Sequence, residues 1–147
     1  MTASPTADTN ADVAGAVPLD ITVRFAETDA MRVVHHSAYI VWFEAGRIAW
    51  LDAAAMPYTC ISGAGYNFAV TDVQCRYRTA IRFGDPVQVL TRLRTLRSRQ
   101  IEFAYEIRNR QTGLLYASGH TGHICVDESG RMTRMPDWVL AGLGRDA

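Results

Sequence analysis

The chain has 147 residues, 48% of them hydrophobic, and a formal net charge of zero at pH 7. These values indicate one globular domain with a substantial core. They argue against nucleic-acid binding, because no basic stripe is present, and no apolar run approaches the ~20 residues of a membrane span. The three cysteines, Cys60, Cys75 and Cys125, form no CxxC pair, which argues against a zinc knuckle and favours a cytoplasmic protein.

Residues 1–18 are rich in Ala, Thr, Asp and Pro, with neither a basic start nor an apolar core. This pattern is not that of a signal peptide. It predicts a disordered tail over 1–18 and a folded domain over 19–147.

The first element along the domain is a strand, because residues 20–27 alternate apolar and polar side chains. From Ser37 the apolar residues recur at three- and four-residue spacing, which predicts a long helix. His36 or Ser37 is its expected N-cap, and Pro57 its expected end. The apolar stripe comprises Tyr39, Trp42, Phe43, Gly46, Ala49, Trp50 and Ala53.

Four further strands are expected, followed by a short closing helix at 136–143. The alternating segments are 68–83, 87–96, 101–110 and 114–127, separated by GDP, SRQ and QTG turns. Strands joined by tight turns pair antiparallel, which predicts a meander. The long helix has only the concave face of this sheet to cover it. The free sheet edges predict a homodimer or homotetramer.

Several spaced motifs carry a family resemblance. They are Glu27-Thr28-Asp29, Val34-His35-His36, Tyr39, Phe43-Glu44-Ala45-Gly46-Arg47 and the Gly84-Asp85 turn. In this order they resemble the acyl-CoA thioesterases of the 4-hydroxybenzoyl-CoA thioesterase and Tol-Pal-associated thioesterase group, over residues 19–138. The resemblance implies the α+β hotdog fold, an antiparallel sheet wrapped around one long central helix. It also implies an acyl-CoA or acyl-carrier-protein substrate and no cofactor.

The resemblance assigns roles to individual residues. Asp29 is the expected general base or nucleophile, and a backbone N–H near His36 is expected to polarise the thioester carbonyl, with the His36 side chain in support. Glu44 is a candidate for contact with the acyl group, and Tyr39, which belongs to the core by default, is a candidate for the wall of the acyl pocket. In the family, basic residues at the turn that holds Arg97 and Arg99 contact the phosphates of CoA, which arginine binds well.

Each assignment has a structural alternative. Asp29 is also a residue type that closes turns, and His36 one that caps helices. Glu44 and Arg47 have the spacing of an i,i+3 ion pair, and Arg97 and Arg99 that of a solvated turn.

A metal site is not expected. His35 and His36 are adjacent, and His120 and His123 fall on opposite faces of a strand. These two strand histidines are interpreted as polar strand residues, and a place for His123 at a subunit interface stays open.

One departure from the family pattern concerns Arg32, which stands where the family usually has glycine. Arg32 is expected either to hold an ordinary backbone angle or to place a cation near the thioester. The leading function is thioester hydrolysis. The alternatives are a non-catalytic protein that binds acyl-CoA or acyl-carrier protein, and a hotdog dehydratase that uses His36 and Glu44.

Overall fold

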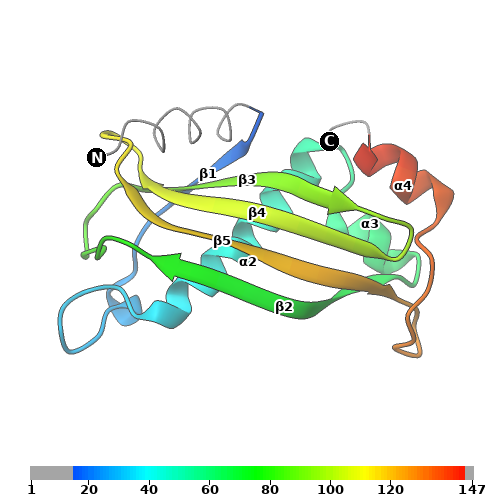
Figure 1. Ribbon diagram of the computed structural model, residues 1–147, viewed down its shortest axis with the longest axis horizontal. Coiled ribbons are helices and arrows are strands. Elements are labelled where there is room, and N and C mark those ends of the chain that lie inside the picture. Colours follow the sequence, from blue (N-terminus) through cyan, green and yellow to red (C-terminus); the bar gives the residue numbers. More distant parts are fainter. Residues whose placement is uncertain (1–14, 145–147) are drawn as a thin grey trace.

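The computed structural model describes residues 15–144, which form a five-stranded antiparallel sheet with a long helix against one face (Figure 1). The predicted α+β architecture, a sheet wrapped around one central helix, is confirmed. The elements in chain order are β1 (Val17–Ile21), the 3-10 turn η1 (Phe25–Glu27), α2 (His36–Ala53), α3 (Tyr58–Gly63), β2 (Asn67–Tyr77), β3 (Val87–Leu96), β4 (Gln100–Asn109), β5 (Leu115–Val126) and α4 (Asp137–Gly144).

The strand order is β1-β3-β4-β5-β2, so the four strands after the helix do not form a simple meander. Strands β3, β4 and β5 pair in succession as predicted, but β2 pairs with β5 at the edge of the sheet. The predicted strand 68–83 is observed only as far as Tyr77, where β2 ends. The Gly84–Pro86 turn belongs to the connection between β2 and β3, which crosses the end of the sheet. The alternation of apolar and polar residues in the sequence continues past Tyr77 because Ile81 is apolar and buried. Ile81 is buried within this connection, however, and not in a strand.

Strand β1 begins at Val17, which pairs with Thr91 of β3. The described chain thus reaches into the segment predicted to be a disordered tail, and the part of that tail up to residue 14 lies outside the described residues. The predicted strand 20–27 is wrong beyond Ile21. Phe25–Glu27 instead form a 3-10 turn, closed by a hydrogen bond from the Glu27 N–H to the Arg24 carbonyl.

Helix α2 ends at Ala53, four residues before Pro57, the predicted end. Ala55 takes a left-handed conformation (φ 58°), and the Met56 N–H donates to the Leu51 carbonyl (2.9 Å). This is the Schellman arrangement, here built without glycine. Pro57 instead precedes the short helix α3, which was not predicted.

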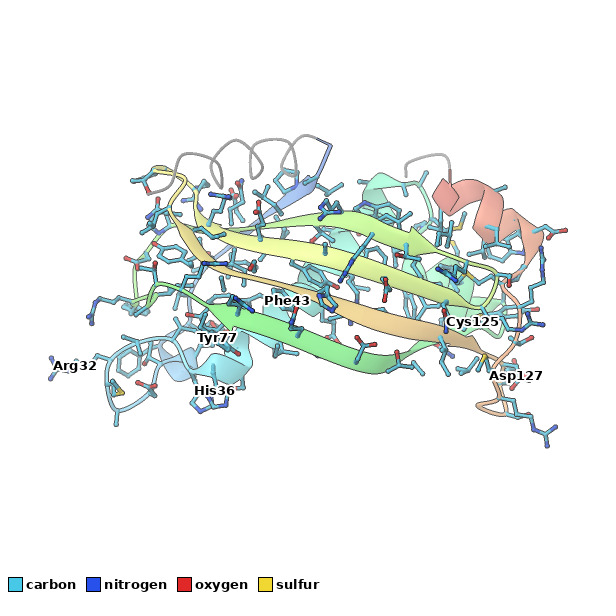
Figure 2. All side chains as sticks on the ribbon, viewed as in Figure 1. Arg32, His36, Phe43, Tyr77, Cys125 and Asp127 are labelled. Carbon is cyan, nitrogen blue, oxygen red and sulfur yellow. The ribbon has the colours of Figure 1, made fainter. Side chains whose placement is uncertain are left out.

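The predicted apolar stripe of α2 packs against the concave face of the sheet, although its last member, Ala53, is exposed. Phe43 lies at the middle of the sheet (Figure 2) and stacks on Tyr105 of β4, with ring centroids 4.3 Å apart. At Gly46 the helix lies close to β3, because a Cβ there would collide with Thr91 and Val89. The absence of a side chain at Gly46 therefore sets how closely the helix lies on the sheet.

Replacement of Gly46 by alanine is expected to destabilise the fold by about 1–3 kcal/mol, because an overpacked core must shift helix or sheet. The measurement is the free energy of unfolding from urea titration. Gly63→Ala is the matched control, since Gly63 is also helical and a Cβ there meets nothing within 4 Å. Its unfolding free energy is expected to stay the same or rise by up to about 1 kcal/mol. Equal effects of both substitutions would contradict this account of the helix position.

Candidate active site

The loop between η1 and α2 folds into a tight turn around Asp29. The Asp29 Oδ1 atom accepts hydrogen bonds from the N–H groups of Met31 (2.8 Å) and Val33 (3.5 Å). The Asp29 N–H donates to the Val33 carbonyl, and the Asp29 carbonyl accepts from the Arg32 N–H, both at 2.9 Å. The other carboxylate oxygen, Oδ2, has no hydrogen-bond partner among the described residues. Asp29 therefore closes a turn with one carboxylate oxygen, and the second oxygen takes no part in the turn.

Arg32 occupies the left-handed backbone region within this turn, with φ 66°. The expectation of an ordinary backbone angle at Arg32 is thus wrong. Its exposed side chain extends away from the rest of the molecule (Figure 2), so the alternative of a cation beside the site is not supported either. Arg32 adopts the backbone conformation for which glycine is usually required.

Helix α2 begins next to this turn, with His35 as its N-cap rather than the predicted His36 or Ser37. The His35 Nδ1 atom accepts a hydrogen bond from the Ser37 N–H (3.1 Å). The N–H of His36, the first helical residue, makes no hydrogen bond with the described residues. Such an N–H carries part of the positive end of the helix dipole.

Tyr77 of β2 joins the sheet to this helix end. Its hydroxyl donates to the His36 carbonyl (2.8 Å), and its ring packs edge-on against Tyr39, with centroids 4.8 Å apart. Burial raises the pKa of both hydroxyls to about 12, with a further upward contribution from Cys75 in each case. Both tyrosines therefore remain neutral at physiological pH. Tyr77 was not predicted as a site residue, because the alternation of apolar and polar residues around it indicated only a strand.

Three predicted site residues, Asp29, His36 and Tyr39, line one surface hollow of about 290 Å³, called here the Asp29 hollow. The rest of its wall comes from the loop before α2, the end of β2 and the segment that follows: Val33, Val34, Tyr77, Arg78, Thr79 and Ala80. A carboxylate oxygen and a helix N-terminus thus border the same space, as the resemblance implied.

Glu27 connects the turn before Asp29 to helix α2 through buried hydrogen bonds. It is 9% exposed, and its carboxylate accepts hydrogen bonds from the Arg24 N–H (2.7 Å) and the Trp42 indole N–H (3.0 Å). Burial acts to raise the pKa of Glu27, but these hydrogen bonds and the Arg24 guanidinium outweigh it and hold the pKa below its ordinary value. The Glu27 carbonyl also accepts from the His35 N–H (2.7 Å). Glu27 is thus ionised and structural.

Glu44 lies in a different hollow of the same chain, of about 250 Å³, called here the His123 hollow. It is lined by α2, α3 and three strands: Glu44, Arg47, Ile48, Leu51, Tyr58, Phe68, Val70, Phe103 and His123. Glu44 and Arg47 approach each other at 3.8 Å, so the predicted i,i+3 ion pair is present. At most it contributes a few tenths of a kcal/mol, because the Glu44 side chain is 69% exposed.

A chain of polar groups runs behind this hollow. An Arg47 N–H donates to the Tyr105 hydroxyl (3.4 Å), which lies 2.6 Å from the Thr121 hydroxyl, and the Thr121 hydroxyl lies 2.8 Å from His123 Nε2. His123 is only 3% exposed, and its Nδ1 atom has no hydrogen-bond partner among the described residues. Burial and the nearby Arg47 charge lower the pKa of His123 to about 4, against an opposing effect of Asp72.

Arg97 and Arg99 are exposed and flank the β3–β4 turn, as predicted. The β3–β4 turn lies at one end of β5, because the Arg99 carbonyl accepts a hydrogen bond from the Cys125 N–H. Tyr77, which lines the Asp29 hollow, pairs with Ala117 near the other end of β5. The eight or so residues of strand between these points span about 26 Å. Within one protomer the two arginines therefore lie far from the Asp29 hollow.

Among residues 15–144, no group of three or more His, Cys, Asp or Glu side chains is arranged to hold a metal ion. No helix in the same range combines the length and the apolar character that crossing a membrane requires.

Comparison with known proteins places this geometry in a family. Residues 23–143 match the model of the thioesterase-like superfamily. The proposed acyl-CoA thioesterase YneP of Bacillus subtilis is 32% identical over 127 residues, which cover 83% of this chain and 91% of that protein.

Solved structures agree in fold. A hypothetical protein from Thermus thermophilus is 38% identical, with a TM-score of 0.85, covering 89% of this chain and 99% of its own. The DHNA-CoA thioesterase from Staphylococcus aureus is 29% identical, with a TM-score of 0.82, covering 88% of this chain and 89% of its own. The expected hotdog fold is thereby confirmed.

Acidification is expected to destabilise the protein through His123. Because burial and the neighbouring Arg47 hold its folded pKa near 4, the unfolded chain, whose His123 has the ordinary value near 6.5, binds a proton that the folded chain does not. This contribution to stability is complete above pH 6.5 and declines as the pH falls toward 4. Between pH 7 and pH 5 the loss attributable to His123 is about 2 kcal/mol.

The measurement is urea unfolding of the native protein and of His123→Gln at both pH values. The variant is expected to lose less stability on acidification than the native chain, and His120→Gln, on the opposite strand face, to behave like the native chain. An unchanged pH dependence in His123→Gln would contradict the low pKa.

Proposed function

The chain belongs to the thioesterase-like superfamily, and from that premise we propose that it hydrolyses acyl-CoA thioesters to a free acid and coenzyme A. The observation that carries this proposal is that Asp29 and His36 line the same hollow. Among the described residues, the Oδ2 atom of Asp29 and the N–H of His36 at the start of α2 have no hydrogen-bond partner. A thioester needs both a source of nucleophile and a donor for its carbonyl oxygen.

Asp29 supplies the first requirement by one of two routes. As a general base it takes a proton from water, the water oxygen bonds to the thioester carbon, and the C–S bond breaks to release CoA thiolate, which then takes up the proton. As a nucleophile its Oδ2 bonds to the thioester carbon and the C–S bond breaks, which releases CoA thiolate and leaves an anhydride; water then opens the anhydride to the free acid and the Asp29 carboxylate, and the proton released goes to the thiolate. The hydrogen bonds on Oδ1 hold the carboxylate in place for either route.

The His36 N–H supplies the second requirement. Negative charge develops on the carbonyl oxygen when the carbon becomes tetrahedral, and one fixed N–H donor contributes about 3–4 kcal/mol to its stabilisation. Tyr77 acts as a positioning residue, because its hydrogen bond to the His36 carbonyl fixes the first turn of α2. Tyr39, a neutral buried phenol, forms part of the wall against which substrate rests.

We further propose that the working unit is a homodimer in which two β2 strands pair antiparallel, with a tetramer of such dimers as an extension. The side of β2 away from β5 has no strand partner among the described residues. β2 also exposes Val70 and Val73, at 52% and 43%. Two-fold pairing places the Phe68 end of one β2 beside the Tyr77 end of the other.

This pairing would combine the two hollows at each interface, because Tyr77 lines the Asp29 hollow and Phe68 the His123 hollow. It would also bring the β3–β4 turn of one protomer toward the Asp29 hollow of the other. Arg97 and Arg99 are then positioned to bind the phosphates of CoA, and Glu44 to contact the acyl group.

A non-catalytic acyl-CoA-binding protein is the second candidate, because the turn-closing role of Asp29 would by itself explain an aspartate there. A dehydratase that uses His36 and Glu44 is the third, and these two residues line different hollows of one protomer. Substitution of Asp29 separates the candidates.

Asp29→Asn is expected to reduce kcat/KM for thiol release from acyl-CoA by several hundred-fold, about 4 kcal/mol, because asparagine is neither base nor nucleophile. Thiol release is measured colorimetrically. Asp127→Asn is a closely matched control, because Asp127 closes an identical turn: its Oδ1 accepts from the N–H groups two and four residues ahead. The control is expected to retain full activity. Equal activity of both variants, or no thiol release by the native chain, would refute the Asp29 mechanism.

Val73→Asp is expected to dissociate the dimer, because two carboxylates would face each other near the two-fold axis of the paired strands. Light scattering after gel filtration is expected to give at least twice the 16.3 kDa chain mass for the native protein and the chain mass for the variant. Leu114→Asp is the control, since Leu114 is a similarly exposed apolar residue (49%) that does not belong to β2. A native monomer, or a variant that stays dimeric, would contradict pairing through β2.

A further inference from the structure

The outer face of the sheet is the side away from α2, and in Figure 1 it faces the reader with α2 behind it. Gly119 of β5 faces the helix, because a Cβ there would meet the Phe43 ring, so Ser118 and His120 face outward. A hollow of about 410 Å³ lies over these outward residues. It is called here the arginine groove, because four arginines line it: Arg76 and Arg78 of β2, and Arg92 and Arg94 of β3.

The strand register explains why this part of the face is hollow. In the sheet, β2 and β3 flank the central pair of strands, β4 and β5. Two adjacent rows of outward residues cross the four strands: Gln74, His120, Ala104 and Arg92 in one, and Arg76, Ser118, Glu106 and Leu90 in the next. The small side chains of Ala104 and Ser118 therefore form a low floor on the central strands, and long arginine side chains stand on both sides of it.

Positive charge is concentrated in the arginine groove. Arg76, Arg78 and Arg94 are exposed, and their side chains form no hydrogen bond or ion pair with the described residues. Glu106 also lines the groove, but Arg108 binds both of its carboxylate oxygens, at 3.2 and 3.3 Å. The chain as a whole has a formal net charge of zero. The groove is thus a local positive site, which attracts anions.

The two ends of the groove differ. At one end, Asp72 of β2 and Glu102 of β4 both pair with Gly122, in the next row of the same face. Their carboxylates repel a long polyanion that would extend across the sheet in this direction. At the other end, Arg78 lines both the arginine groove and the Asp29 hollow. The groove therefore suits a compact anion and adjoins the candidate active site.

We propose that the arginine groove binds the phosphate chain of a nucleotide. Guanidinium groups bind phosphate through pairs of parallel N–H···O bonds, and here they flank the Ala104–Ser118 floor from two strands. A second copy of this face is not the occupant, because it would bring arginines against arginines.

Two nucleotides have this chemistry. One is a free nucleoside triphosphate, and the other is a CoA molecule whose phosphates reach the groove past Arg78 of the same protomer. Binding is measured without turnover, so this inference goes beyond the proposed function and does not require it.

The first test is calorimetric titration of the native full-length chain with inorganic tripolyphosphate. Saturable binding is expected at low ionic strength, and it is expected to weaken as salt is added. In Arg76→Gln/Arg94→Gln the dissociation constant is expected to rise by about tenfold or more, because charge-assisted hydrogen bonds are lost. Neither side chain contacts another described residue, so the variant is expected to fold, and urea unfolding checks this.

Arg110→Gln/Arg131→Gln is the matched control. It removes the same charge from two exposed arginines that do not line the groove. Its dissociation constant for tripolyphosphate is expected to stay within about twofold of the native value at the same ionic strength. No saturable binding by the native chain, or equal weakening in the two double variants, would overturn the inference. Equal weakening would mean that only the net charge matters.

Competition calorimetry distinguishes the two nucleotides. If CoA displaces tripolyphosphate and itself binds more weakly to Arg76→Gln/Arg94→Gln, the groove holds the phosphates of CoA. If ATP displaces tripolyphosphate and CoA binds both proteins equally, the ligand is a free nucleotide. Displacement by neither would overturn the inference. Failure of the proposed thioesterase function is separately visible as the absence of thiol release from every acyl-CoA, and it leaves these binding results unchanged.

Discussion

The geometry of the Asp29 hollow depends on one buried carboxylate, that of Glu27. Its oxygens bind the Arg24 N–H and the Trp42 indole, and its backbone carbonyl binds the His35 N–H. A single residue thus ties the turn before Asp29 to the N-cap of α2 and to the second turn of that helix. Separation of this loop from the helix would break these hydrogen bonds, and each buried donor left unsatisfied costs about 1–3 kcal/mol. The spacing between the Asp29 carboxylate and the helix N-terminus is therefore set by folding, before any substrate binds, as electrostatic stabilisation of a transition state requires.

The chain contains the Asp29 turn twice, and the comparison separates conformation from function. Asp127 makes the same side-chain and backbone hydrogen bonds as Asp29, and Gly130 (φ 82°) stands where the first turn has Arg32 (φ 66°). Glycine takes this conformation without strain, whereas arginine does so at a cost of about 1 kcal/mol. Turn chemistry alone thus explains an aspartate at both places. Only Asp29 borders a hollow that also contains an unpaired helix N–H, so position in the fold, not the local motif, makes one of the two a candidate for catalysis.

The sequence predicted what local periodicity controls and missed what distant contacts control. The α2 stripe up to Trp50 and the bounds of β3 were accurate, because each depends on side chains a few residues apart. The position of β2 at the edge of the sheet, beside β5, was missed. The connection after Tyr77 contains one buried apolar residue, Ile81, and its pattern therefore resembled a continued strand. Asp29 and His36 came from family resemblance and not from periodicity. The buried polar chain that ends at His123 was beyond reach, because Arg47, Tyr105 and Thr121 come from three different elements.

The two hollows lie at opposite ends of β2, because Tyr77 lines the one that holds Asp29 and Phe68 lines the one that holds Glu44. Hydrolysis consumes water, and Asp29 lies on a partly exposed turn that water reaches. In the proposed dimer, antiparallel pairing of β2 brings the Asp29 hollow of one protomer against the His123 hollow of its partner. A substrate that extends beyond one hollow would then contact both chains, so the complete site would exist only when two chains associate.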